Sequence, residues 1–246
     1  MKKVIITSFL VILFLHVVNS QNGDNIGGGP FIKRIENNKI VDWQYNLSSK
    51  SAVEKLFFGE INAPIEFFYH PSFEGAYGFR VMKDSLNNCY MLEIKLISNY
   101  EEAHKEALNK NKSIGIPANM MSSMPKDIRE LIAEHNKAVN SKYFEELPKL
   151  YKIKTLVFQI SEQFAGKLHK KMVFFIENFV VKDLPHVIND GYDVTFRTVV
   201  EYEVWSLSIH VPQGKAEKLS NLCRQIVKDA IDNKLDESKY MSILDK

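Results

Sequence analysis

Hydrophobic and polar residues alternate along two pairs of neighbouring segments, and each pair predicts an antiparallel β-hairpin. Residues 76–83 and 89–98 are joined by the polar sequence DSLNN, and the second hairpin begins at Tyr192. On the return strand of the second hairpin, alternation places Trp205, Leu207, Ile209 and Val211 on a core face, and Val204, Ser206, Ser208 and His210 on the other. Further strands are predicted over 153–160 and in the region 39–45.

Helical periodicity recurs between these strands. Ser51 and Glu54 have the spacing of a capping box, which predicts a short helix that Gly59 ends. Helices are also predicted over 100–109, after Pro125, after Ser161 and after Gly214. The helix after Pro125 has an apolar face and is expected to end or kink at Pro148; the face comprises Ile128, Leu131, Ile132, His135, Val139 and Tyr143. The apolar face after Ser161 comprises Phe164, Leu168, Met172, Ile176 and Phe179.

The mixed order of strands and helices predicts an α+β fold in which antiparallel β-hairpins pack against several amphipathic helices. We expect one globular domain over residues 31–246. The two hairpins also resemble each other, since both contain an aromatic residue followed by arginine, Phe79-Arg80 and Phe196-Arg197. This likeness suggests a helix–hairpin–helix duplication with halves 50–110 and 161–232 joined by 111–160. The competing interpretation is that any hairpin uses aromatic and branched residues in this way.

The amino terminus indicates export. A basic start and the apolar run 4–18 have the form of a signal peptide over residues 1–20, and the run is too short for a confident membrane span. The mature chain would begin at Gln21 with a flexible, glycine-rich leader over 21–30. An amino-terminal glutamine just after the cleavage site resembles exported proteins of the Bacteroidetes, where it is frequent, so we expect bacterial export to the periplasm or the extracellular space. Sequons at Asn46 and Asn111 leave a eukaryotic secreted protein as the alternative.

Charge and cysteine content narrow the functional classes. Without residues 1–20 the chain has 30 Lys and Arg against 30 Asp and Glu, which gives no reason to expect a nucleic-acid partner. An exported chain with two cysteines invites a disulfide between Cys89 and Cys223. The pattern argues against that bond, because Cys223 falls on the apolar stripe of the last helix and Cys89 alternates with charged residues.

Common catalytic signatures are missing from the sequence: there is no nucleophile elbow, phosphate-binding loop, HExxH, CxxC or dinucleotide fingerprint. We therefore expect no cofactor and no metal site. His210, with Glu203 and Arg197, is the candidate for a polar cluster in which the histidine acts as a general base. The competing interpretation is a cross-strand ion pair between Arg197 and a glutamate. Glu101 and His104 share a helical face, which we interpret as an ordinary helix surface.

The segment 109–125 has no defensible period and is predicted to be a long loop. Its methionines, Met120, Met121 and Met124, are candidates for adaptable contacts with a partner, or else they cover the core. Export without a recognisable catalytic site favours a non-enzymatic binding or assembly module of the bacterial cell envelope, whose partner is an envelope protein or a small ligand. The alternative is an envelope hydrolase built on the His210, Glu203 and Arg197 cluster.

Overall fold

The computed structural model describes residues 31–37, 50–180 and 190–245. In these ranges the strands form one seven-stranded sheet with the order β1-β7-β6-β2-β3-β4-β5, and all neighbours are antiparallel. The strands are β1 (Phe31–Asn37), β2 (Ile65–Pro71), β3 (Tyr77–Asp84), β4 (Cys89–Ile97), β5 (Ile153–Ile160), β6 (Tyr192–Val200) and β7 (Glu203–His210). The predicted signal peptide, leader and strand over 39–45 lie outside the described residues.

The helices are α1 (Ala52–Phe58), α2 (Tyr100–Lys110), α3 (Ala118–Met121), α4 (Lys126–Leu150), α5 (Glu162–Glu177), α6 (Gly214–Ile231) and α7 (Glu237–Leu244). The predicted α+β fold is therefore confirmed, and both hairpins, β3–β4 and β6–β7, form as expected. Sequence patterns did not reveal β1, β2, α7 or the single turn α3. Pro148 lies in the last turn of α4, two residues before its end.

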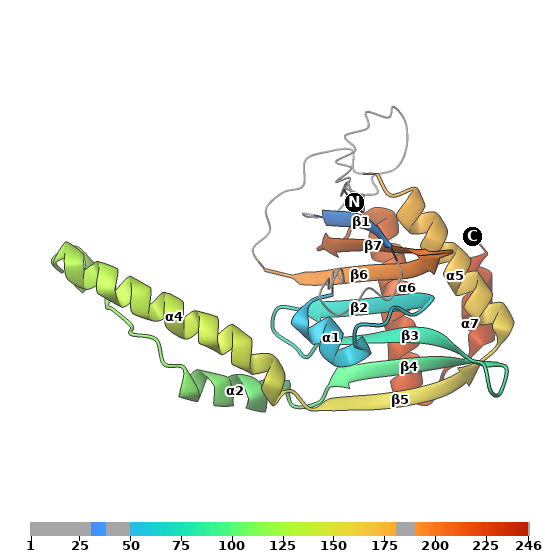
Figure 1. Ribbon diagram of the computed structural model, residues 1–246, viewed down its shortest axis with the longest axis horizontal. Coiled ribbons are helices and arrows are strands. Elements are labelled where there is room, and N and C mark those ends of the chain that lie inside the picture. The colour runs from blue at the N-terminus through green and yellow to red at the C-terminus, as the bar shows by residue number, and fades with distance from the viewer. Residues whose placement is uncertain (1–30, 38–49, 181–189, 246) are drawn as a thin grey trace, which may run out of the picture.

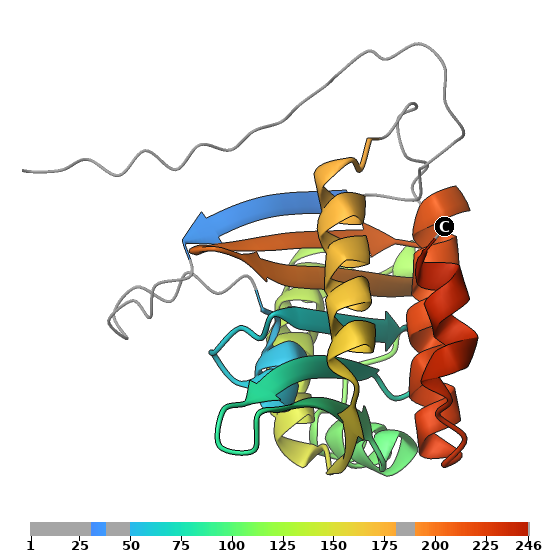
Figure 2. The same ribbon diagram turned by 90° about the vertical axis from the view of Figure 1, so that its right-hand side faces the viewer.

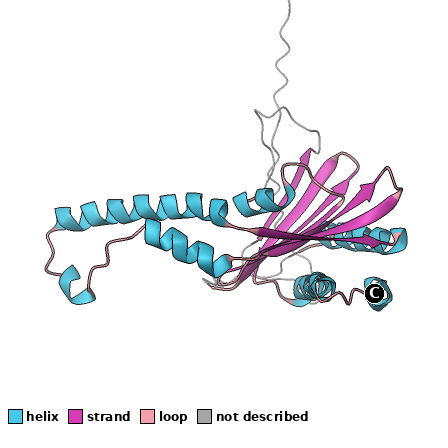
Figure 3. Ribbon diagram, turned by 90° about the horizontal axis from the view of Figure 1, so that it is seen from below, coloured by secondary structure: helices cyan, strands magenta, loops and turns pink. Residues whose placement is uncertain are grey.

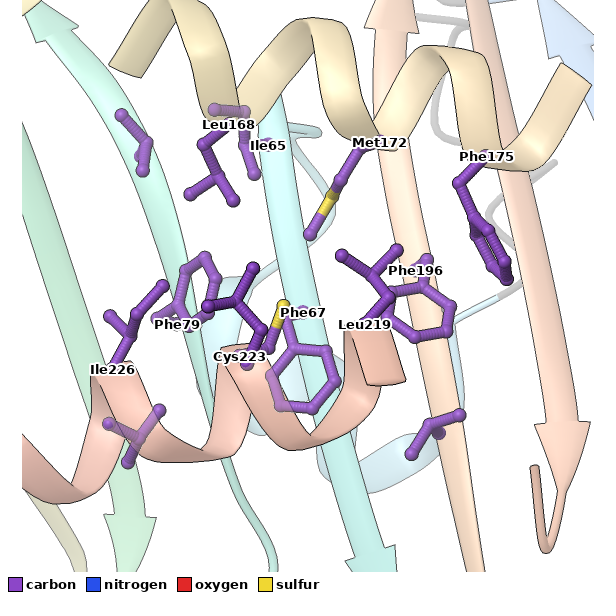
Figure 4. Close-up of a cluster of buried hydrophobic side chains, with 14 of the residues drawn as sticks. Ile65, Phe67, Phe79, Leu168, Met172, Phe175, Phe196, Leu219, Cys223 and Ile226 are labelled. Atoms are coloured by element: carbon purple, nitrogen blue, oxygen red, sulfur yellow. The ribbon is translucent and has the colours of Figure 1, made fainter. Parts of the chain in front are cut away.

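One face of the sheet is covered by α5, α6 and α7, and the main hydrophobic core lies between these layers (Figures 1 and 2). Figure 4 shows side chains of α5 and α6 meeting those of the central strands, such as Leu168 and Cys223 against Phe79 and Phe67. The five members of the apolar stripe predicted after Ser161 are all buried, and four of them lie on α5, since Phe179 follows the end of the helix. Ser161 caps α5 by accepting a hydrogen bond from the Phe164 amide.

The opposite face of the sheet carries α1. Phe67 belongs to the main core, whereas its neighbour Phe68 packs with Phe57 and Phe58 of α1, and successive residues of a strand point to opposite faces. The predicted capping box is present: Ser51 Oγ accepts from the Glu54 amide, and a Glu54 carboxylate oxygen accepts from the Ser51 amide. These two hydrogen bonds fix the first turn of α1.

Helices α2 and α4 project together from one end of the sheet, as Figure 3 shows from below. We call residues 100–150 the arm. The 25 residues of α4 correspond to a length of about 37 Å. At the root of the arm, Ala103 and Ala107 of α2 pack against Leu147 of α4. The arm is therefore a helical hairpin whose outer half extends beyond the sheet (Figure 1).

The proposed duplication is not confirmed. The two hairpins correspond, but the helices that follow them differ: α6 packs into the main core, whereas α2 packs against α4 in the arm. Both cysteines are free thiols, as the pattern indicated. Cys223 is buried in the main core, and Cys89 lies beside Met91, with 3.6 Å between the sulfur atoms.

Candidate functional site

Arg197 is held in a buried ion cluster beneath α1. Its Nη1 donates to Glu66 Oε2 and its Nη2 to Glu54 Oε1, both at 2.9 Å, and the exposed fraction of Arg197 is only 2%. Burial alone would lower the pKa of Arg197, but the two carboxylates outweigh that effect and raise it. Both terminal nitrogens of the guanidinium are thus engaged in joining three elements: β6, β2 and α1.

Lys50 completes this cluster on the side of the segment between α1 and β2. Its Nζ donates to Glu66 Oε1 at 3.0 Å and to the carbonyl oxygens of Ile61 and Gly59. Burial lowers the pKa of Lys50, and Glu66 opposes that shift. Two cations therefore face two carboxylates, and the arrangement clamps α1 and the following segment onto the sheet. The role of Arg197 here is positioning, which matches the cross-strand pairing that the sequence offered as the competing interpretation.

His210 lies elsewhere on the same face, at the end of β7. Its Nδ1 is 2.9 Å from Asp193 Oδ1, the carboxylate directly opposite it on β6. Glu203 stands at the other end of β7, seven residues away, and accepts a hydrogen bond from Trp205 Nε1 at 2.8 Å. Seven residues of strand span about 23 Å. The structure therefore does not bring His210, Glu203 and Arg197 together.

Instead, three residues on adjacent strands form a row: His70 on β2, Asp193 on β6 and His210 on β7. His70 as a residue is exposed, but neighbouring atoms desolvate its ring and lower its pKa, while Asp193 opposes the shift. The Nε2 atom of His210 is buried without a hydrogen-bond partner in the described part of the chain. Sequence reasoning missed this row because it depends on the register of three strands that are distant along the chain.

The backbone next to His210 is strained. Val211 has φ of +46°, a left-handed conformation that is unusual for a β-branched residue. Gly191, at φ +142°, lies against it: a Cβ on Gly191 would stand 2.4 Å from Val211 Cγ2. The nearby hydroxyls of Thr195 and Ser208 bond to each other at 2.8 Å. The described residues contain no group of three or more His, Cys, Asp or Glu side chains suited to a metal ion.

A histidine also organises the root of the arm. His104 of α2 bonds through Nδ1 to the Tyr143 hydroxyl at 2.7 Å and through Nε2 to the Tyr151 hydroxyl at 3.2 Å. The centroids of the Tyr100 and His104 rings are 4.0 Å apart. Desolvation lowers the pKa of His104, and the nearby His70 adds to this effect. His104 is therefore a hydrogen-bonding centre between α2 and the C-terminal part of α4, a more specific role than an ordinary helix surface.

The segment that leads outward from α2 is fixed to α4 at two places: Asn111 donates to Glu146 at 3.3 Å, and Asn136 bonds to the backbone further along. The Asn136 carboxamide accepts from the Ile114 amide at 2.8 Å and donates to the Ile114 carbonyl at 3.0 Å. This two-point contact holds a stretch of backbone that belongs to neither helix. The segment that the sequence predicted as a loop is thereby anchored along α4, and the short helix α3 turns the chain back at the end.

Apolar side chains are exposed along the outer half of the arm. We define the arm tip as Ile114, Met120, Met124, Ile128 and Leu131. The exposed fractions of Met120 and Leu131 are 54% and 61%, and Met124 is half-buried. The Met121 backbone lies in α3, and its side chain is outside the described set. Half of the apolar face predicted for α4 is thus not covered by this chain, because Ile128, Leu131 and His135 remain exposed.

No protein-family model, curated protein or solved structure matches this chain. None of the helices in the described ranges has the combination of length and hydrophobicity that a transmembrane helix requires. Two features of the molecule are candidates for a functional site: the row of His70, Asp193 and His210, and the arm tip.

Proposed function

We propose that this protein is an exported, non-enzymatic binding or assembly module of the bacterial cell envelope and that the arm tip is its contact surface. The observation that carries the proposal is the exposure of large apolar side chains on a projecting, internally braced arm. Exposed apolar surface of this kind is typical of interaction sites. The arm holds these side chains away from the sheet, where a partner can reach them.

The composition of the tip supports an apolar contact with an envelope protein. Residues 111–125, which include Ile114, Met120 and Met124 of the arm tip, contain no acidic residue and only one charged residue, Lys112, whereas charged residues flank Ile128 and Leu131 on α4. Methionine is unbranched and polarisable, so Met120 and Met124 can adapt to a partner surface. Braced backbone with adaptable side chains limits the entropy that is lost on binding.

A photo-crosslinking residue at position 120 tests the proposal in the native host. We expect one discrete crosslinked partner, whose purified form binds the protein directly and at least tenfold more weakly after Met120→Ser with Leu131→Ser. The matched control is Leu86, an exposed apolar residue in the β3–β4 turn with an exposed fraction of 97%. Crosslinks that are equally strong from positions 120 and 86, or binding that the double substitution leaves unchanged, would reject the arm tip as the contact surface.

Export and the site of cleavage have a separate test. Amino-terminal analysis of the mature protein from its host should find a chain that begins at Gln21, and fractionation should place that chain in the envelope or the medium. Retention of residues 1–20 in the cytoplasm would contradict export while leaving the binding role of the arm open to its own test.

An envelope hydrolase remains the alternative, and the pair of His210 and Asp193 is the observation that favours it. A carboxylate bonded to Nδ1 orients a histidine so that Nε2 can act as a general base. However, Nε2 of His210 is buried, so a substrate would reach it only after movement of the surrounding chain. If the alternative holds, His210→Gln should abolish hydrolysis of ester and peptide substrates by the purified protein; activity that survives the substitution would reject it.

A further inference from the structure

Strand β5 forms one edge of the sheet, and its features are those of a strand that needs a partner. In the described part of the chain β4 is its only strand neighbour, so the backbone groups along its outer edge are unpaired by the sheet. Residues 155–160, TLVFQI, contain no charge, proline or glycine. Natural sheets protect exposed edges with charges, proline or bulges, because such a segment otherwise pairs with another chain.

The opposite edge strand, β1, shows the protection that β5 lacks. β1 has seven residues, and three of them, Lys33, Arg34 and Glu36, are charged. The eight residues of β5 include one charge, Lys154, near its beginning. The two edge strands therefore differ in charge, and only β1 carries several charged side chains that oppose pairing with another strand.

We propose that β5 pairs antiparallel with β5 of a second copy of this chain, which forms a dimer with a continuous sheet. In an antiparallel pair, opposite residues must lie on the same face, so the two-fold axis passes through a residue position. An axis at Val157 places Val157 opposite itself and Leu156 opposite Phe158. The same register places Thr155 opposite Gln159 and Lys154 opposite Ile160.

In this register, apolar side chains of β5 on both faces of the sheet gain contacts with the second copy. Leu156 and Phe158 are half-buried residues at the border of the main core, so their pairing would extend that core across the dimer. Val157, with an exposed fraction of 53%, would be covered by its own copy. The two Lys154 side chains face apolar residues rather than each other, which avoids like-charge repulsion. This self-complementarity is the reason for choosing a second copy rather than a strand from another protein.

The oligomeric state of the purified protein tests the proposal. Light scattering coupled to size-exclusion chromatography should show a dimer that dissociates on dilution, and Val157→Lys should give a monomer with an unchanged circular dichroism spectrum. Ile35→Lys on β1 is the matched control, because Ile35 has an exposed fraction of 54% and lies on the protected edge. It should leave the dimer intact. A protein that is monomeric at all concentrations, or a dimer that Val157→Lys does not weaken, would overturn the proposal.

Disulfide trapping tests the register itself. In a Cys89→Ser background, Val157→Cys should form an intermolecular disulfide under mild oxidation, because residues on the axis have Cα atoms about 5 Å apart. Thr155→Cys should not, since its two copies would be separated by four residues of strand, about 13 Å. Equal trapping at both positions, or trapping at Thr155 alone, would overturn this pairing. The proposal does not depend on the arm, so failure of either leaves the other standing.

Discussion

Arg197 and Glu66 are 131 residues apart in the chain, yet they lie opposite each other on β6 and β2 and form an ion pair of 2.9 Å in which both side chains are buried. Glu66 is also opposite Arg80 on β3, and Arg80 pairs with Glu93 on β4. A row of alternating charges thus crosses four strands beneath α1. Ordinary cores exclude charges, and these persist because each has a partner.

Truncation of Arg197 should strongly destabilise the fold. Arg197→Met leaves Glu66 and Glu54 buried with reduced compensation, and breaking a buried pair in this way costs about 3–5 kcal/mol. The measurement is the free energy of unfolding in urea at neutral pH. Arg129→Met on the exposed surface of α4 is the control and should change that energy by no more than about 0.5 kcal/mol. Equal effects of the two substitutions would contradict the clamping role of Arg197.

Gly78 on β3 should tolerate no side chain. A Cβ at this position would lie 2.3 Å from the Phe67 carbonyl oxygen and 3.3 Å from the Phe58 ring, so the strand pair or α1 would have to shift. We expect Gly78→Ala to destabilise the protein by about 2 kcal/mol or more, in the range of overpacked cores. Gly166 in α5 has open space, and Gly166→Ala should stabilise by up to about 1 kcal/mol. Thermal unfolding of both variants distinguishes them by the sign of the change in Tm.

Asp229 should make the docking of α7 depend on acid pH. It accepts hydrogen bonds from Lys239 and Tyr240 on α7 and from Gln225 on α6, and these bonds lower its pKa to about 2. Because the folded-state pKa is below that of the unfolded chain, the stabilisation is complete above about pH 4 and is lost as the pH falls towards 2. Asp229→Asn should lower the unfolding free energy at pH 7 by about 1–3 kcal/mol. The difference between the two proteins should vanish near pH 2, and a difference that is independent of pH would contradict this account.

His104 should loosen the root of the arm at mildly acid pH. Its folded-state pKa is lowered by desolvation, so below about pH 6.5 the unfolded chain binds more protons and stability falls with the pH. The protection factors of the α2 amides, which correct for the intrinsic pH dependence of hydrogen exchange, should fall between neutral and mildly acid pH more than those of the α5 amides. His104→Gln should remove that pH dependence, while His135→Gln, at an exposed position on α4, should preserve it. Retention of the pH dependence in the His104 variant would show that another group is responsible.

The sequence was sufficient to predict those features that depend only on residues close together in the chain. The capping box of Ser51 and Glu54 involves residues three apart, and the stripe of α5 repeats within one helix, so both could be predicted without knowledge of their surroundings. The hairpins joined strands that are neighbours along the chain. β2 was missed because five of its seven residues are buried in succession, so that no alternation of polar and apolar residues marks the strand.

What the sequence determined by itself was therefore the α+β class, the hairpins, the caps and the faces of most helices, because short-range periodicity and capping set these. The tertiary structure alone decided which residues meet. Arg197 pairs with Glu66, and His210 pairs with Asp193. Met120 and Leu131 remain exposed on the arm, and β5 lies at an edge of the sheet. These relationships depend on strand order and register between distant segments, which no local pattern specifies.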